Sequence, residues 1–471
     1  MIKCRFFDGR IKNMDWNSCF SHGRFGQGII SATPRTPYER DFDRLIFSAA
    51  FRRLQDKTQV FPLPGPVLVH NRLTHSLEVA SVGRSLGKIV GERLLEVLTP
   101  ELHPEAQRFY LSDLSSVVAA ACLAHDIGNP SFGHSGEAAI SAYFQEEAAA
   151  SIGGQSLQEY FSAAEWSDLT HFEGNANALR ILTHHYANRQ KGGFQLTYTT
   201  LAAIAKYPCE STAMDGKSLL TKKFGFFQKE KEAYREIAGK LQLNVLSESP
   251  LVFQRHPFVW LVEAADDICY RIIDWEDAHR LGIIDSGTAI HLLLQLLETS
   301  ATENMDRVHR TLNELQQDPR EQLAYLRAKA INFLTVSCSE VFIERRNDLL
   351  TGIYNRSLID GLNPATAKAL SDINEVTVSK IYNHETVVKI ELAGYEVMRS
   401  LLTAFIPAVL KGQPSHKEKK VLKLLPLQYR EEEQSAYDRV LSVIDFIAGM
   451  TDSYAMELYK NLRGISLPTH T

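Results

Sequence analysis

Hydrophobic positions along the chain recur mostly at intervals of three and four residues, the spacing that places them on one face of an α-helix. The longest example covers residues 73–98, where an apolar side runs beside charged positions. The same spacing occurs in residues 38–54, 137–147, 172–185, 257–274, 320–343, 365–381, 387–410 and 435–462. Alternation typical of strands is scarce; its best example is residues 194–199, where we expect a short hairpin arm. The pattern therefore predicts a mainly α-helical fold.

Two segments depart from this amphipathic pattern, one because it is wholly apolar and one because it contains helix-breaking residues. Residues 115–128, SSVVAAACLAHDIG, are apolar on every side up to the final polar pair, which predicts a helix at the centre of the protein. Prolines and a glycine within residues 62–66 predict a turn before the long helix.

Composition narrows the class of protein. The 471 residues are 44% hydrophobic and 23% charged, which excludes a disordered or low-complexity chain. The net charge is −5, so the protein has no overall positive charge that would indicate binding to nucleic acid or to an anionic membrane. The longest fully apolar run is residues 117–124, far below the roughly 18 residues that cross a bilayer, so no membrane span is predicted. The cysteines are scattered without a CxxC pair, and the N-terminus resembles no secretory signal. We expect reduced core cysteines and a cytoplasmic location.

His125 and Asp126 stand where the most apolar segment ends. Burial of an unpaired charge there is costly, and a divalent cation would compensate both side chains at once. A buried hydrogen-bonded His–Asp pair that only joins two helices is the alternative, and on the dipeptide alone it is the more probable interpretation.

Other polar residues favour the cation. His75 begins the helix predicted at 73–98. Asp266, Tyr270 and Asp274 are spaced i, i+4 and i+8 along one stripe of a helix whose flanks are core-like. Carboxylates gathered on one face of a buried helix repel each other unless a cation or polar ligand is present. The candidate ligands are then two imidazoles and two carboxylates: His75, His125, Asp126 and Asp266.

The order His…His-Asp…Asp resembles the HD-domain metallohydrolases. The chain is more closely similar to the deoxyguanosine triphosphate triphosphohydrolase family, relatives of the mammalian SAM-and-HD-domain dNTP hydrolase. The segments that carry this resemblance are DRLIFSAAFRRLQDKTQVFP, HDIGNPSFGHSGE, HFEGNANALRIL, KYP, KKFGFFQKEK, EAADDICY and IAGMTDSYAMELY. It implies an N-terminal loop segment 1–37, an HD-domain metallohydrolase core 38–290, and a C-terminal helical region 291–471 that completes the pocket and makes oligomer contacts.

The same resemblance implies an activity and its residues. Family members cut a deoxynucleoside triphosphate (dNTP) between the sugar 5′ oxygen and the α-phosphorus, which releases a deoxynucleoside and inorganic triphosphate; dGTP is the favoured substrate. The four candidate ligands would hold Mn²⁺ or Mg²⁺, with Fe²⁺ or Zn²⁺ as alternatives. His134 and Glu137 would be the catalytic pair, although His134 also fits a loop histidine that caps a helix. Substrate contacts carry over to Gln59 and Asp274 at the sugar 3′-hydroxyl, Arg72 and Lys206 at the triphosphate, and Tyr207 and Tyr270 along the channel.

Several alternatives stay open at this point. Another HD-class phosphohydrolase, such as a 5′-nucleotidase or a phosphodiesterase, would use the same ligands, and a non-catalytic nucleotide or nucleic-acid binder would keep the pocket. The resemblance also implies a homo-oligomer, for example a hexamer. The lysines of residues 411–423 are candidates for binding single-stranded nucleic acid, although a solvated linker is the simpler interpretation. The metal is assigned to Asp266, and Asp267 is available instead for a structural salt bridge with an arginine such as Arg271.

Overall fold

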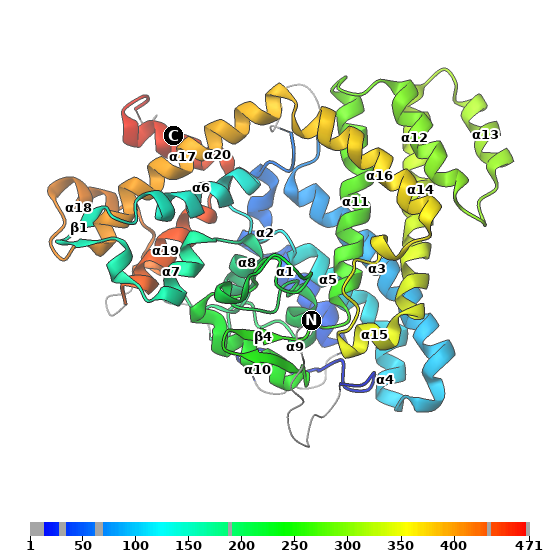
Figure 1. The fold of residues 1–471 in the computed structure, drawn as a ribbon, viewed down its shortest axis with the longest axis horizontal. Coiled ribbons are helices and arrows are strands. Elements are labelled where there is room, and N and C mark those ends of the chain that lie inside the picture. Colours follow the sequence, from blue (N-terminus) through cyan, green and yellow to red (C-terminus); the bar gives the residue numbers. More distant parts are fainter. Residues whose placement is uncertain (1–13, 28–33, 62–68, 187–190, 431–434, 468–471) are drawn as a thin grey trace.

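The computed structural model describes residues 14–27, 34–61, 69–186, 191–430 and 435–467, and helices make up most of it (Figure 1). The helices before α11 are α1 (Pro37–Ile46), α2 (Ala49–Arg52), α3 (Arg72–Leu98), α4 (Pro104–Arg108), α5 (Leu114–Ala124), α6 (Gly133–Glu146), α7 (Ala163–Thr170), α8 (Gly174–Thr183), α9 (Tyr198–Ile204) and α10 (Lys231–Lys240). From there on they are α11 (Val259–Arg280), α12 (Ser286–Glu298), α13 (Met305–Glu314), α14 (Pro319–Glu344), α15 (Arg346–Thr351), α16 (Pro364–Val376), α17 (Glu385–Leu410), α18 (His416–Leu422), α19 (Ala436–Ala448) and α20 (Asp452–Arg463). The mainly α-helical prediction is confirmed.

Strands are few and short among the described residues. β1 (Ser151–Ile152) pairs antiparallel with β2 (Gln155–Ser156), and β3 (Val245–Glu248) pairs antiparallel with β4 (Leu251–Phe253). The strand predicted at residues 194–199 is wrong. The Thr197 hydroxyl there accepts a hydrogen bond from the Thr200 N–H and so caps the start of α9 instead.

Most predicted helices are found, with two breaks. Residues 38–54 form α1 and α2, because the chain turns at residues 47–48 and the Ser48 hydroxyl caps α2 through the N–H of Phe51. Residues 435–462 form two helices, α19 and α20, because the chain turns at residues 449–451 and Thr451 caps α20 through the N–H of Tyr454. The turn predicted at residues 62–66 lies outside the described residues. Five cysteines are buried and free of disulfides in the described part of the chain, as predicted; Cys4 lies outside it.

The core that positions the site is built on α3 and α5. Residues 117–124 of α5 are buried throughout, as expected for a helix that is apolar on every side. Glycines four residues apart on α3 let the two backbones approach closely. A Cβ at Gly87 would lie 2.8 Å from Ser115 Cα, and one at Gly91 would lie 2.1 Å from the Tyr110 carbonyl oxygen. α11 packs against both helices.

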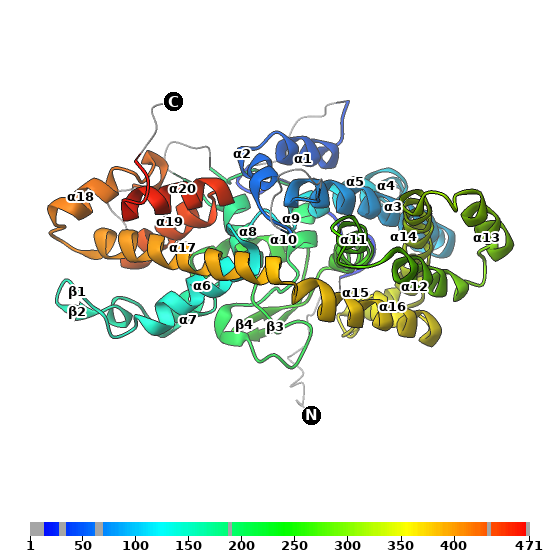
Figure 2. The same cartoon turned by 90° about the horizontal axis from the view of Figure 1, so that it is seen from above.

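A second hydrophobic cluster joins α6, α17 and α19. α17 runs along the molecule from the side of α16 to the side of α18–α20, as both views show (Figures 1 and 2). Among the described helices, α17 alone is long and apolar enough to span a membrane by length and composition. Half of its most apolar window is buried against the rest of the protein.

Candidate metal centre

His75 is placed by the beginning of α3. Asn71 caps this helix: its side chain accepts a hydrogen bond from the Thr74 N–H at 2.9 Å, and the Thr74 hydroxyl accepts one from the Asn71 N–H at 3.0 Å. This reciprocal cap fixes the first helical turn. His75 is therefore held in a rigid, buried position near the helix N-terminus.

His125 is placed by the opposite end of α5. Its Nδ1 donates a hydrogen bond to the Cys122 carbonyl oxygen at 2.6 Å, which leaves Nε2 as the atom free to bind a metal. Nε2 is buried and makes no hydrogen bond to any described residue. Its neighbours are carboxylate oxygens, Asp266 Oδ1 at 3.4 Å and Asp126 Oδ1 at 3.6 Å, so the nitrogen lies beside charges that can balance a cation.

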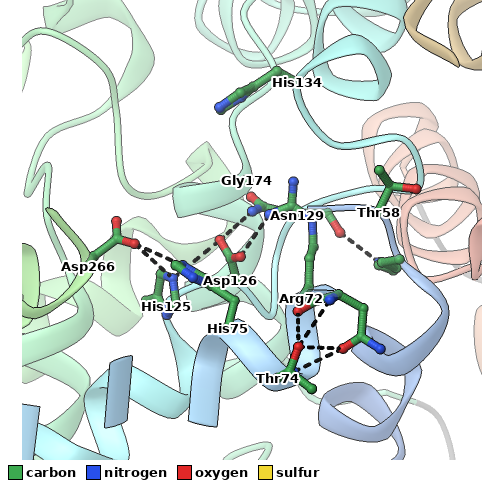
Figure 3. Close-up of polar contacts among 12 residues, drawn as sticks. Thr58, Arg72, Thr74, His75, His125, Asp126, Asn129, His134, Gly174 and Asp266 are labelled. Atoms are coloured by element: carbon green, nitrogen blue, oxygen red, sulfur yellow. Dashed lines mark hydrogen bonds and ion pairs between the residues drawn. The ribbon is translucent and has the colours of Figure 1, made fainter. Parts of the chain in front are cut away.

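Asp266 on α11 completes a three-residue cluster. Its Oδ1 lies 3.1 Å from His75 Nε2 and 3.4 Å from His125 Nε2, and all three ligand atoms lie within 4.8 Å of one another (Figure 3). Two imidazole nitrogens and one carboxylate oxygen suit a divalent cation with further coordination positions for water or substrate. The residues present therefore fit a metal ion.

The electrostatics of the cluster agree with this fit. Burial tends to raise the pKa of Asp266, but His125 and His75 hold it well below its usual range, so the carboxylate is ionised. Burial lowers the pKa of His125, whereas Asp126 and Asp266 raise it to about 9 overall. A cation at this position replaces the imidazole proton, so its binding is coupled to proton release.

Asp126 lies beside the cluster with both oxygens engaged. Oδ2 accepts a hydrogen bond from Arg72 Nη1 at 2.7 Å, and Oδ1 accepts one from Asn129 Nδ2 at 2.5 Å. Oδ1 is also 3.6 Å from His125 Nε2. Asp126 is therefore not part of the cluster formed by His75, His125 and Asp266. Its role as a fourth metal ligand stays a prediction.

The cluster opens into a cavity of about 590 Å³. The predicted site residues that line the cavity are Gln59, Arg72, His75, His125, Asp126, His134, Glu137, Lys206, Tyr207, Asp266 and Tyr270. These residues come from the segment before α3, from α3, α6 and α11, from the C-terminal end of α5 and from the residues that follow α9, so the fold brings together positions that are far apart in the sequence. Asp274 is absent from the described lining.

His134 and Glu137 form a hydrogen-bonded pair on the first turn of α6. His134 Nδ1 lies 2.8 Å from Glu137 Oε2, and Glu137 Oε1 accepts a hydrogen bond from the Gly174 N–H at 2.7 Å. The hydrogen bond to Glu137 raises the pKa of His134. Glu137 is buried, whereas the His134 side chain is 85% exposed and stands apart from the metal-ligand cluster (Figure 3). This geometry leaves Nε2 of His134 facing solvent.

Lys206 is held by a buried acidic residue. Glu263 accepts contacts from Lys206 Nζ at 3.2 Å through Oε1 and from Arg255 Nη1 at 3.2 Å through Oε2. Lys206 Nζ also lies 5.9 Å from the centre of the Tyr207 ring. Lys206 is thus a cation fixed in the cavity wall rather than a surface ion pair.

Gln59 and Tyr270 line another part of the cavity. Gln59 Oε1 is buried and has no hydrogen-bond partner among the described residues. The Tyr270 ring stacks on Tyr382, with ring centres 5.9 Å apart. Tyr382 donates a hydrogen bond to Asp274 Oδ2 at 3.0 Å. Burial raises the pKa of Asp274 to about 7.

The position of Asp274 follows from helix geometry. Eight residues at about 1.5 Å each place Asp274 roughly 12 Å along the axis of α11 from Asp266, where it accepts the hydrogen bond from Tyr382. Asp267 makes no ion pair with Arg271 within the described structure, contrary to expectation, and lines the cavity. Burial raises the pKa of Asp267 to about 7.

Sequence reasoning missed several lining residues. Lys223 pairs with Glu173 at 2.8 Å, and Tyr382 and Glu391 reach the cavity from the C-terminal region. Lys223 lies in the KKFGFFQKEK segment, so the resemblance contained a signal for it. No spacing within the sequence indicated Tyr382 or Glu391.

The lysine segment 411–423 surrounds α18, at the end of the molecule that holds α18–α20 (Figure 1). Lys411 Nζ pairs with Glu418 Oε1 at 2.6 Å, which partly neutralises the segment. Lys417, Lys419 and Lys420 are exposed. Binding of nucleic acid there stays a prediction.

Comparison with known proteins gives matches over nearly the whole chain. The HD domain matches residues 72–205, and the phosphohydrolase-associated domain matches residues 361–461. Deoxyguanosinetriphosphate triphosphohydrolase-like proteins of Synechocystis sp. and Pseudomonas aeruginosa (strain LESB58) are each 39% identical, over 96% and 97% of this chain and 100% of their own length. The deoxyguanosinetriphosphate triphosphohydrolase of Yersinia enterocolitica is 32% identical over 90% of this chain and 93% of its own. The predicted domain boundaries at residues 37 and 290 stay a prediction.

Proposed function

Because the chain belongs to the deoxyguanosinetriphosphate triphosphohydrolase family of HD-domain hydrolases, we propose that it hydrolyses dNTPs to a deoxynucleoside and inorganic triphosphate, with dGTP as the favoured substrate. The observation that carries this proposal is the cluster of His75, His125 and Asp266 in a cavity that also presents His134 and Glu137. The cavity volume of about 590 Å³ falls within the range of small-molecule sites.

The metal would be held by His75, His125 and Asp266, with Asp126 proposed as a fourth ligand. Mn²⁺ or Mg²⁺ is favoured, and Fe²⁺ or Zn²⁺ are the alternatives. When bound, the cation supplies Lewis-acid polarisation of the α-phosphate. Arg72 orients Asp126 through a buried charge-assisted hydrogen bond, and so it supports the site even before substrate binds.

Proton transfer is assigned to His134. Glu137 accepts the Nδ1–H of His134 and is itself fixed by the Gly174 N–H, so the imidazole is held in one orientation with Nε2 free. Nε2 exchanges a proton with the attacking water or with the leaving 5′ oxygen. Such positioned acid–base groups contribute roughly 10²- to 10⁴-fold to enzymatic rates.

Substrate binding is assigned to the remaining walls. Lys206 and the free N–H groups of Arg72 bind triphosphate oxygens, and Tyr207 and Tyr270 line the channel. The buried, unpartnered Oε1 of Gln59 suits an acceptor for the sugar 3′-hydroxyl. Asp274 was expected at the same hydroxyl; we now propose that it holds Tyr382, from which it accepts a hydrogen bond.

We also propose that the protein acts as a homo-oligomer, for example a hexamer. Light scattering coupled to gel filtration tests this directly. A monomer at micromolar concentration would contradict it.

The activity is tested with a panel of dNTPs and ribonucleotides, each incubated with Mn²⁺, Mg²⁺, Fe²⁺ or Zn²⁺ and separated by anion exchange. We expect intact triphosphate and a deoxynucleoside, with dGTP the fastest substrate and ribonucleotides unreactive. Orthophosphate or pyrophosphate as the product would indicate a different HD-class phosphohydrolase. Binding of nucleotide without turnover would indicate a non-catalytic pocket.

A further inference from the structure

The first residue of α20 bridges two separate walls of the cavity. Asp452 is 8% exposed. Its Oδ2 accepts a hydrogen bond from the Thr58 N–H at 2.8 Å, and its Oδ1 accepts one from the Phe132 N–H at 2.9 Å. Thr58 directly precedes Gln59, and Phe132 lies two residues before His134. One carboxylate from the C-terminal region therefore holds both segments.

The backbone at Phe132 needs such support. Its φ of 62° and ψ of 17° lie in the left-handed region, which residues other than glycine rarely adopt. No side chain caps α6, which starts at the next residue. A conformation of this kind persists only where the surrounding structure fixes it. The direction in which α6 leaves this turn determines where His134 lies.

α17 supports the same residue from another side. A Cβ at Gly394 would lie 2.5 Å from Phe132 Cβ, so the Phe132 side chain rests directly on the α17 backbone. The left-handed turn is thus enclosed by two elements of the C-terminal region, Gly394 of α17 and Asp452 of α20.

Other hydrogen bonds also tie this loop to the C-terminal region, one directly from the α19–α20 turn and two through the Lys57 side chain. The Ser131 hydroxyl donates to the Met450 carbonyl oxygen at 2.9 Å. Lys57 Nζ donates to the Asn129 carbonyl oxygen at 2.6 Å and to the Ala448 carbonyl oxygen at 2.8 Å. Asp452 differs from these because a single carboxylate of the C-terminal region accepts a backbone N–H from each of the two cavity walls.

We propose that Asp452 is a positioning residue that places His134 and Gln59 in the cavity, although it does not itself line the cavity. This inference rests on the proposed function, because it assigns Asp452 to the reaction of that site. It gives the C-terminal helices a part in catalysis: they fix the left-handed turn from which the acid–base histidine projects.

The test compares Asp452→Ala and Asp452→Asn with Ser453→Ala. Ser453 is the next residue of α20, and its hydroxyl donates to Asp56 Oδ1, just before the 57–61 wall, and contacts neither the Thr58 N–H nor the Phe132 N–H. Amide hydrogen exchange of residues 57–61 and 128–136 reports on the two walls without any substrate. We expect faster exchange at Thr58 and Phe132 in Asp452→Ala, a smaller change in Asp452→Asn, which keeps one acceptor oxygen, and none in Ser453→Ala.

Activity and metal affinity separate positioning from general loss of structure. In Asp452→Ala we expect kcat to fall about 10-fold or more, with metal affinity within about 2-fold of wild type, because the metal ligands lie on α3, α5 and α11. Asp452→Asn recovers part of kcat, and Ser453→Ala keeps all of it. A parallel loss of metal affinity and kcat would overturn the proposal in favour of a structural role.

Two other results would also be decisive. Unchanged exchange at Thr58 and Phe132, or faster exchange with full kcat, overturns the positioning role. If the wild-type protein releases no triphosphate from any dNTP, but Asp452→Ala still shows faster exchange, the proposed function is overturned. The finding that Asp452 fixes Thr58 and Phe132 would then remain.

Discussion

Nε2 of His75 lies 3.1 Å from Oδ1 of Asp266, although the two residues are 191 positions apart in the chain. One stands at the start of α3 and the other within α11, and His125 reaches the same carboxylate from the end of α5. These three helices pack directly on one another, so the candidate metal centre is built on the core of the protein.

Asp266→Asn is expected to abolish stoichiometric metal binding and triphosphate release. The neutral amide removes the charge that balances the cation, while the side chain keeps its size. Elemental analysis of the purified protein measures the first effect. A rise in melting temperature on addition of Mn²⁺ should occur in wild type and disappear in this variant.

Asp267→Asn is the matched control for that change. Asp267 is the adjacent carboxylate on α11 and points about 100° away from Asp266 around the helix. Its replacement should leave metal stoichiometry unchanged. Equal loss of metal in both variants would show that general electrostatics, rather than ligation by Asp266, retains the cation.

His134→Ala is expected to keep the metal and to lose about 100-fold or more in kcat, in line with removal of a general acid–base group. His171 is an exposed histidine on the protein surface, outside the described cavity lining, and His171→Ala should turn over normally. Normal turnover by His134→Ala would remove its assigned role.

Glu137→Gln should shift the pH dependence of turnover. In the wild-type protein the hydrogen bond to Glu137 raises the pKa of His134 above its ordinary value of 6.5. A neutral amide no longer favours the imidazolium, so the pKa of His134 falls and the limb of the kcat profile assigned to it moves to lower pH. A limb that stays in place would mean that another group titrates there.

The sequence predicted a structural element correctly where the pattern lay within a single helix. The long period of three and four residues located α3, and the wholly apolar segment located buried α5. The cost of burying charge singled out His125, Asp126 and Asp266. The fold gathers His125 and Asp266 with His75 and leaves Asp126 beside them. The resemblance, rather than any spacing, supplied the roles expected of His134 and Glu137.

Other features depend on contacts that no local pattern contains. Tyr382 and Glu391 reach the cavity because the segment before α17 and α17 itself pass over it, a tertiary arrangement. Residues 194–199 alternate like a strand, but a capping threonine starts a helix within them. Asp274 follows Asp266 at i+8, but it lies roughly 12 Å further along α11 and contacts Tyr382 outside the described lining.

Gly87→Ala is expected to lower the free energy of unfolding by about 1–3 kcal/mol, the usual cost of overpacking a close helix contact. The added Cβ would meet the α5 backbone at Ser115 Cα, 2.8 Å away. Because α3 and α5 carry His75 and His125, metal affinity should fall as well. Thermal melting and metal titration measure the two effects.

Gly239→Ala on α10 is the control for that substitution. A Cβ there meets no atom within 4 Å. Alanine also favours a helix over glycine, so the melting temperature should hold or rise. A similar loss of stability at Gly239 would contradict the argument from close packing.

The central claim is that the centre built by His75, His125 and Asp266 serves attack by water on the α-phosphorus of a dNTP. It is tested most directly by running the reaction in ¹⁸O-labelled water and analysing both products by mass spectrometry. The account predicts one ¹⁸O atom in inorganic triphosphate and none in the deoxynucleoside. Two results would contradict this account: ¹⁸O in the deoxynucleoside, or ¹⁸O in orthophosphate or pyrophosphate instead of triphosphate.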